Sequence, residues 1–166
     1  MQPTGLPVTS AACAPAAPGL TPAADARFVR WSTRSQGVTG EAGHLKYTRV
    51  YSDAEGESHF EDVEVGMNEV VFAPPAPPLK LSEFMATSRF SFLSADPGWS
   101  GDWHPAPKRQ FMLYLQGEIE AEVSDGEVRR FGPGSATLVE DTKGRGHRSA
   151  VVGDQEVVMA VVQLDD

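Results

Sequence analysis

From Lys46 onward the chain consists of short runs of strand-forming residues, separated by turns rich in Gly, Pro and Asp. No stretch has the period of a long amphipathic helix, and the proline-rich segment 73–78 (APPAPP) has no place inside a sheet. Many short strands with regularly spaced turns are typical of a barrel or sandwich, so the sequence predicts an all-β fold. The predicted strands are 46–51, 59–65, 68–72, 89–93, 110–115, 118–123, 136–140, 148–152 and 156–164.

The side-chain patterns predict where some of these strands lie. Segments 110–115 and 156–164 are apolar on both faces, which favours central strands, whereas 118–123 (EIEAEV) alternates between apolar and acidic residues. Asp125-Gly126 is typical of a two-residue hairpin turn, which would pair Ala121 with Arg130 on the inner face. In that register either Arg130 lines a pocket, or a bulge turns it outward.

Composition limits the domain organisation and the partners. Segment 1–43 is dominated by Ala, Pro, Gly, Ser and Thr, which predicts a disordered N-terminal extension followed by one domain over 44–166. The net charge of −9 argues against nucleic acid or an anionic membrane as the main partner. Cys13 is the only cysteine, and no secretory signal or membrane-length apolar run is present, so we expect a cytoplasmic protein.

One stretch gathers most of the residues that could carry chemistry. Segment 98–117 (GWSGDWHPAPKRQFMLYLQG) places His104 just before an apolar strand, and Gly144-Arg145-Gly146-His147 places a second histidine before another strand. Two histidines at such positions predict one pocket built from two strands. We expect its walls to be aromatic and apolar, with one basic residue, and the candidates are Trp99, Trp103, Met112, Tyr114 and Arg130.

Residues 98–147 resemble the two sequence motifs of the cupin superfamily. His104 resembles the second histidine of the first motif, Asp102 stands at the place of the first histidine, and Gln110 stands near the place of the glutamate, one residue further from His104 than the motif has it. Gly144-x2-His147 resembles the end of the second motif, with Thr142 where proline is usual. This resemblance implies a small jelly-roll β-barrel, with a metal site formed by Asp102, His104, Gln110 and His147.

Cupins with intact motifs hold Fe, Mn, Ni, Zn or Cu on three histidines and a glutamate, and this chain departs from that set. A set of two histidines and one carboxylate leaves coordination positions open on Fe(II). Gln110 would be either a fourth ligand or a group that orients one of the ligands. The cofactor expected from the resemblance is therefore one divalent ion, Fe, Mn, Ni or Zn. In the alternative interpretation Asp102 caps a turn, His104 is a hydrogen-bonded pocket residue, and no metal binds tightly.

Two functions follow from these patterns. The first is a metal-dependent oxygenase, isomerase or lyase acting on a small molecule, with His104 and Tyr114 as candidate catalytic residues. Its substrate would be anionic if the basic residues around His147 steer it. The second is a small-ligand-binding or sensory module without catalysis. The doubly apolar strands also indicate a homodimer, which is frequent among cupins.

Overall fold

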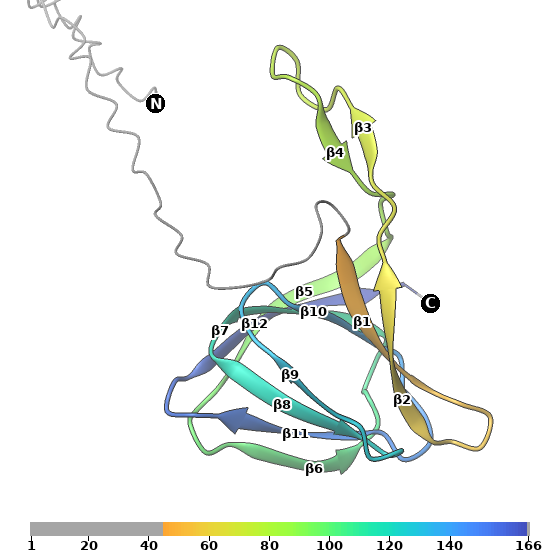
Figure 1. Ribbon diagram of the computed structural model, residues 1–166, viewed down its shortest axis with the longest axis vertical. Coiled ribbons are helices and arrows are strands. Elements are labelled where there is room, and N and C mark those ends of the chain that lie inside the picture. The colour runs from red at the N-terminus through yellow and green to blue at the C-terminus, as the bar shows by residue number, and fades with distance from the viewer. Residues whose placement is uncertain (1–44, 166) are drawn as a thin grey trace, which may run out of the picture. The chain divides into compact units, whose positions relative to one another are not determined.

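The computed structural model describes residues 45–165, so the predicted disordered segment lies outside the described residues. The described part contains twelve strands and no helix (Figure 1). They are β1 (Lys46–Ser52), β2 (Ser58–Glu64), β3 (Asn68–Val70), β4 (Leu79–Leu81), β5 (Thr87–Ala95), β6 (Ser100–His104), β7 (Gln110–Gln116), β8 (Glu118–Val123), β9 (Val128–Phe131), β10 (Ala136–Val139), β11 (His147–Val152) and β12 (Val157–Leu164).

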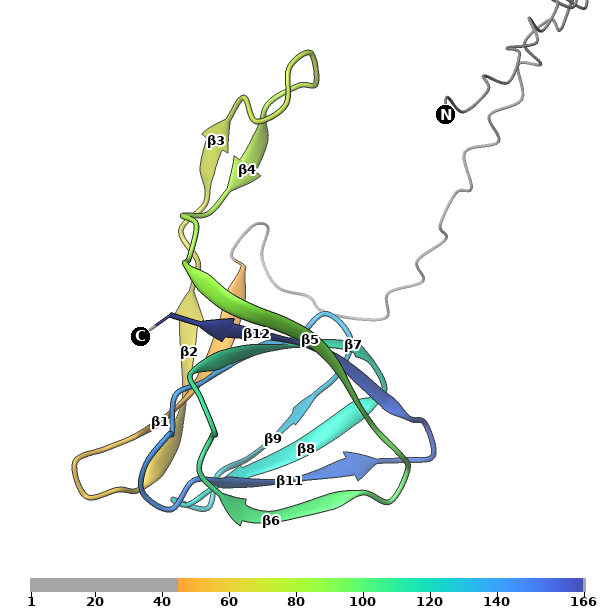
Figure 2. The same ribbon diagram turned by 180° about the vertical axis from the view of Figure 1, so that it is seen from behind.

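Two sheets face each other across the interior of the domain, as both ribbon views show (Figures 1 and 2). One has the order β2-β1-β10-β7-β12-β5 and the other β6-β11-β8-β9. The eight strands from β5 to β12 form two four-stranded layers, β5-β12-β7-β10 and β6-β11-β8-β9, which is the arrangement of a double-sheet jelly roll. The predicted all-β jelly-roll fold is therefore confirmed.

The strands predicted to be central do lie inside the larger sheet. β7 pairs with β10 and β12, and β12 pairs with β7 and β5. Although 110–115 is apolar on both faces, only the inner face of β7 is covered, because Leu113 and Leu115 on its outer side are exposed. Its inner side chains include Tyr114, which is buried against Phe131 with stacked rings 5.5 Å apart.

The turn between β8 and β9 differs from the prediction by one residue. The Gly126 N–H donates to the Val123 carbonyl, and the Val123 N–H donates to the Glu127 carbonyl, so the loop has three residues and ends on Gly126 with a φ of 94°. Arg130 consequently pairs with Glu120 rather than Ala121.

The guanidinium of Arg130 lies on the outer surface, with Nε 2.9 Å from Glu120 Oε2. The prediction that Arg130 lines the pocket is wrong, because the turn adds one residue to the β9 side of the hairpin.

Three local features were not predicted. β6 lies in a stretch for which no strand was predicted, and β4 pairs with β3 in a separate hairpin that extends away from the two sheets (Figures 1 and 2). Residues 82–86, which connect β4 to β5, form no regular element. No helix in residues 45–165 is long and apolar enough to span a membrane.

Candidate functional site

A cavity of about 320 Å³ lies between the two sheets. Its lining is mostly apolar and includes Phe60, Leu93, Ile119, Phe131, Val139 and Met159. Among the described residues that line it there is no lysine, arginine, aspartate or glutamate. The polar groups are two histidines together with Gln110, Tyr114, Thr137 and two serines. Such a space suits a small molecule that is largely apolar.

His104 and His147 lie side by side on the wall of this cavity. They end β6 and begin β11, and the two residues are direct partners in the antiparallel pairing of these strands. Their ring centroids are 4.8 Å apart, with the ring planes at 54°. The structure thus brings together the two histidines that the sequence predicted to share a pocket.

Each imidazole is held through its Nδ1 atom. His147 Nδ1 lies 2.6 Å from Asp141 Oδ2, and His104 Nδ1 lies 2.7 Å from the Asp102 backbone carbonyl. A carbonyl accepts hydrogen bonds only, as does an ionised carboxylate, so both Nδ1 atoms act as donors. In the neutral rings each Nε2 then carries a lone pair, which is the arrangement found in histidines that bind metals or accept protons.

Asp141 is a site residue that sequence reasoning missed. It is fully buried, its backbone carbonyl accepts from the Ala106 N–H, and its Oδ1 has no hydrogen-bond partner among the described residues. The residue follows Glu140 in the segment after β10, where an acid normally indicates a solvated turn. The only sequence feature that could have indicated Asp141 was its position six residues before His147. That spacing alone does not distinguish Asp141 from Glu140.

The backbone close to the histidines explains the glycine in this loop. Gly146 has a φ of 72°, and a Cβ atom there would lie 2.0 Å from the His104 carbonyl oxygen. Only glycine permits both the left-handed conformation and this approach of the two chains. Gly146 therefore fixes how closely β6 and the start of β11 can pack.

Gln110 and Tyr114 point inward from β7, and both are buried. Gln110 Oε1 accepts from Gln163 Nε2 at 3.3 Å, so its oxygen already has one partner. The Tyr114 hydroxyl lies 3.3 Å from Thr137 Oγ1. Burial raises the pKa of Tyr114 to about 12, so its hydroxyl remains protonated at neutral pH.

Of the remaining predicted residues, two line the cavity and two do not. Trp99 and Met112 are part of its wall. Asp102 lines a hollow on the other side of β6, together with Glu120, Glu122 and Arg148, and its Oδ1 accepts from the Trp103 N–H. Trp103 lies beneath the Arg148 guanidinium, 5.3 Å from ring centroid to Cζ. The pairing of β11 with β6 shifts its register between His147 and Ser149, and this irregularity accompanies the orientation of Asp102 and Trp103 away from the cavity.

The structure therefore supplies two imidazoles and one amide, without the carboxylate of Asp102. Within residues 45–165 no group of three or more His, Cys, Asp or Glu side chains is placed to hold a metal ion. The basic residues expected to steer an anion, Lys143, Arg145 and Arg148, do not line the cavity.

No protein-family model matches the chain, and no curated protein matches it. Solved structures do. A Cupin 2 conserved barrel domain protein from Salinispora arenicola is 20% identical, with 61% of this chain and 76% of that chain covered and a TM-score of 0.39. The Cnp3 cupin domain of Schizosaccharomyces pombe is 14% identical over 74% of this chain and 84% of that one, with a TM-score of 0.37. Protein NMB1881 from Neisseria meningitidis is 16% identical over 46% and 72%, also with a TM-score of 0.37.

Proposed function

We propose that this protein binds a small, largely apolar and uncharged molecule in its barrel, with a polar group of the ligand placed against His104 and His147. The observation that carries the proposal is the cavity lining, which is apolar except for this cluster and lacks charged Lys, Arg, Asp and Glu side chains among the described residues. An anionic ligand would lose its hydration there without a cation to replace it. The ligand class therefore differs from the anionic substrate considered from the sequence.

Tryptophan fluorescence provides a direct test. Trp99 lines the cavity and Trp103 does not, so the two form a matched pair. We expect small neutral aromatic probes to change the emission of the wild type and of Trp103→Phe, but not of Trp99→Phe. Matched probes bearing a carboxylate should bind at least roughly tenfold more weakly, because an unpaired charge is costly to bury. Equal binding of both probe classes would overturn the proposed ligand class.

A second candidate function, a metal-dependent enzyme, is favoured by the two Nε2 lone pairs on adjacent rings. By donor type, two imidazole nitrogens and an amide oxygen such as that of Gln110 suit a divalent ion such as Ni²⁺, Zn²⁺ or Fe²⁺, and none of these three donors is anionic. His104 and His147 would hold the ion through Nε2. When bound, it would supply Lewis-acid polarisation of the ligand's polar group.

The roles of the chain's own groups in such an enzyme follow from their contacts. Asp141 and the Asp102 carbonyl orient the two rings, while the apolar wall excludes water. Tyr114, protonated at neutral pH, donates a hydrogen bond into the cavity or to Thr137.

Calorimetric titration of tag-free protein with Ni²⁺ tests this second function. We expect measurable binding that His147→Ala abolishes and that Gln110→Glu tightens, because the new carboxylate restores an anionic ligand. Asp141→Asn should weaken binding roughly tenfold to a hundredfold, as loss of an orienting partner does. Asp154→Asn, in the exposed β11–β12 turn, is the matched control. Absence of binding in the wild type would eliminate the enzyme and leave the ligand-binding module.

A further inference from the structure

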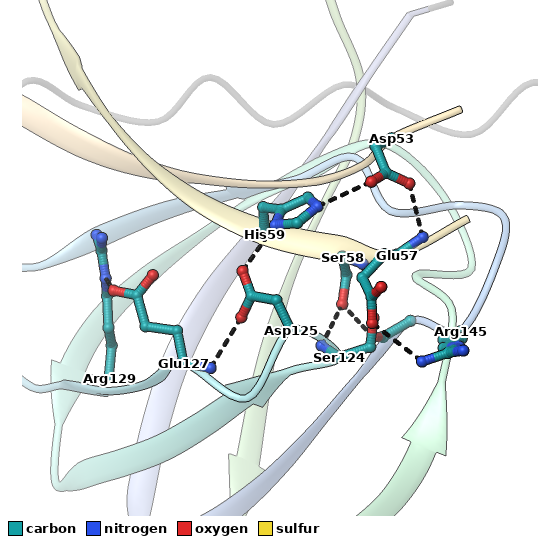
Figure 3. Close-up of polar contacts among 10 residues, drawn as sticks. Asp53, Glu57, Ser58, His59, Ser124, Asp125, Glu127, Arg129 and Arg145 are labelled. Carbon is teal, nitrogen blue, oxygen red and sulfur yellow. Dashed lines mark hydrogen bonds and ion pairs between the residues drawn. The ribbon is translucent and has the colours of Figure 1, made fainter. Parts of the chain in front are cut away.

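Three connections between strands meet where β2 begins: the β1–β2 turn, the β8–β9 turn and the loop that leads into β11 (Figure 3). Ser58, the first residue of β2, is fully buried between them. Its Oγ donates to the Gly146 carbonyl at 2.6 Å and accepts from the Ser124 N–H at 2.7 Å. The Ser58 N–H in turn donates to Ser124 Oγ at 2.7 Å. One hydroxyl thus connects the β8–β9 turn to the residue directly before His147.

The β1–β2 turn holds the same loop further upstream. Ser52 Oγ donates to the Lys143 carbonyl at 2.7 Å, and the Arg145 N–H donates to the Gly56 carbonyl at 3.0 Å. The Arg145 guanidinium also lies 3.0 Å from Glu57 Oε1. The position of this turn therefore determines where the loop, and with it His147, lies.

His59 connects the β1–β2 turn to the β8–β9 turn (Figure 3). Its Nδ1 lies 2.6 Å from Asp125 Oδ2, and its Nε2 lies 3.1 Å from Asp53 Oδ2. Ionised carboxylates only accept, so the ring fills both contacts as a donor only when it is protonated; a neutral ring can donate to one of them.

The surroundings of His59 favour the protonated ring. The hydrogen bonds that the ring donates to Asp53 and then to Asp125 raise its pKa. The pKa of Asp53 is lowered, mainly by its hydrogen bond with His59, and that of Asp125 is lowered by the Glu127 N–H and then by His59. The other groups facing this cluster are the Tyr51 ring, with its centroid 5.5 Å from that of His59, and Arg129, which pairs with Glu127 beside Asp125.

We propose that Ser58 and His59 are positioning residues for His147. The contacts among Asp53, His59 and Asp125, here called the clasp, hold the β11 loop opposite His104, and protonation of His59 tightens them. The consequence for ligand or metal binding rests on the proposed function, whereas the effect on the loop does not.

The pH range follows from the directions of the shifts. Because the pKa of His59 is raised, its contribution is complete below the unfolded value of about 6.5 and is lost as the pH rises through the folded value. The pKa values of Asp53 and Asp125 are lowered, so their contribution is present above about pH 4 and is lost as the pH falls further. The clasp is therefore tightest between about pH 4 and 6.5.

Hydrogen exchange of the full chain, without any ligand, tests the proposal. After correction for intrinsic rates, we expect the amides of residues 143–148 to exchange roughly threefold to tenfold faster at pH 8.5 than at pH 6, the effect of losing one partly exposed charge-assisted hydrogen bond. His59→Gln should exchange at the faster rate at both pH values. Glu69→Gln, an exposed acid on β3 in the separate hairpin, should behave as the wild type.

Ser58→Ala should raise exchange of the same amides at both pH values, because the Gly146 carbonyl loses its donor. If Ser58→Ala prevents folding, the exchange measured for His59→Gln decides the test by itself, because the His59 side chain is partly exposed. Exchange that is independent of pH in the wild type, or unchanged in His59→Gln, would overturn the proposal.

A Ni²⁺ titration of the same proteins separates this proposal from the proposed function. The wild type should bind roughly threefold to tenfold more tightly than His59→Gln at pH 6 and equally at pH 8.5. If the wild type binds neither Ni²⁺ nor neutral aromatic probes while exchange of the loop still follows His59, the proposed function fails and the positioning role stands.

Discussion

At the scale of single residues, two glycines with similar backbone angles have different surroundings. Gly126 has a φ of 94° and open space around it, whereas a Cβ at Gly146 would overlap the His104 carbonyl. Gly126→Ala should cost about 1–2 kcal/mol of the free energy of unfolding, the strain of a left-handed alanine. Gly146→Ala adds a steric overlap and should cost about 3 kcal/mol or more. Urea denaturation of both variants measures the difference, and equal losses would contradict the close approach of β6 and β11.

Tyr114 gives a second prediction at this scale. Its pKa of about 12 lies above that of an exposed phenol near 10, so folding becomes less favourable as the pH rises through this range. In a difference titration between the wild type and Tyr114→Phe, absorbance of the phenolate of Tyr114 should be missing below about pH 11. Phenolate absorbance near pH 10 in the folded protein would show that the hydroxyl is solvated.

How much of the site could be predicted also depends on individual residues. The pairing of His104 with His147 followed from spacing, because each precedes a strand and glycines surround the second. The orientation of Asp102 did not follow, since it depends on an irregular register opposite β6 that no local pattern encodes. The role of Asp141 could not be predicted, because its burial arises from packing between distant segments rather than from its neighbours in sequence.

At the scale of elements, side-chain periodicity predicted most strands but not how they pair. The β8–β9 hairpin shows why. Asp125-Gly126 is compatible with two-residue and three-residue loops, and the loop length shifts the β8 partner of every β9 residue by one position. The irregular strand β6 was missed because Gly, Ser and Asp have low strand propensity, and its formation depends on pairing with β11.

An ion cluster joins three elements of the larger sheet. Glu140, directly after β10, accepts from Arg49 on β1 and from Arg109 just before β7. Burial alone would raise the pKa of Glu140, but the hydrogen bonds from Arg49 and Arg109 outweigh it and the pKa is lowered. Its contribution is therefore present above the unfolded value of about 4.3 and is lost as the pH falls through the folded value.

We expect Glu140→Gln to lose about 1–2 kcal/mol of the free energy of unfolding at pH 7, because two guanidinium groups lose a charged partner. The loss should shrink as the pH falls from about 4.3 through the lowered folded value, below which the wild-type carboxyl is also protonated. Urea denaturation between pH 3 and 7 measures both quantities, with Glu69→Gln on the exposed β3 as control. A loss that did not depend on pH would show that Glu140 acts through packing.

At the scale of the whole molecule, the outer face of the larger sheet suggests how two copies associate. Phe90 and Phe92 on β5 are 61% and 67% exposed, and Leu113 lies in the same row, across Ala160 from Phe92. β5 is also an edge strand, so its free backbone groups can pair with those of another β5 around a two-fold axis. We expect a homodimer through this face.

Light scattering measures the mass directly. The wild type should have the mass of a dimer at micromolar concentration, and Phe92→Lys should give a monomer. Val128→Lys, which changes an exposed apolar residue on the smaller sheet, should remain dimeric. A monomeric wild type would rule out self-association at these concentrations.

The parallel pairing of β1 with β10 has a consequence for the newly synthesised chain. Val50 pairs with Val139, so the first strand of the barrel has no sheet to join until the ribosome has made β10. Until then β1 has only the hairpin with β2, and an isolated two-stranded hairpin is marginally stable at best. Val50 and Phe60, buried in the finished barrel, are then open to chaperones for most of translation. Slow elongation between β2 and β10 would lengthen that exposure, so the yield of folded protein in cells should depend on the speed of translation across this interval.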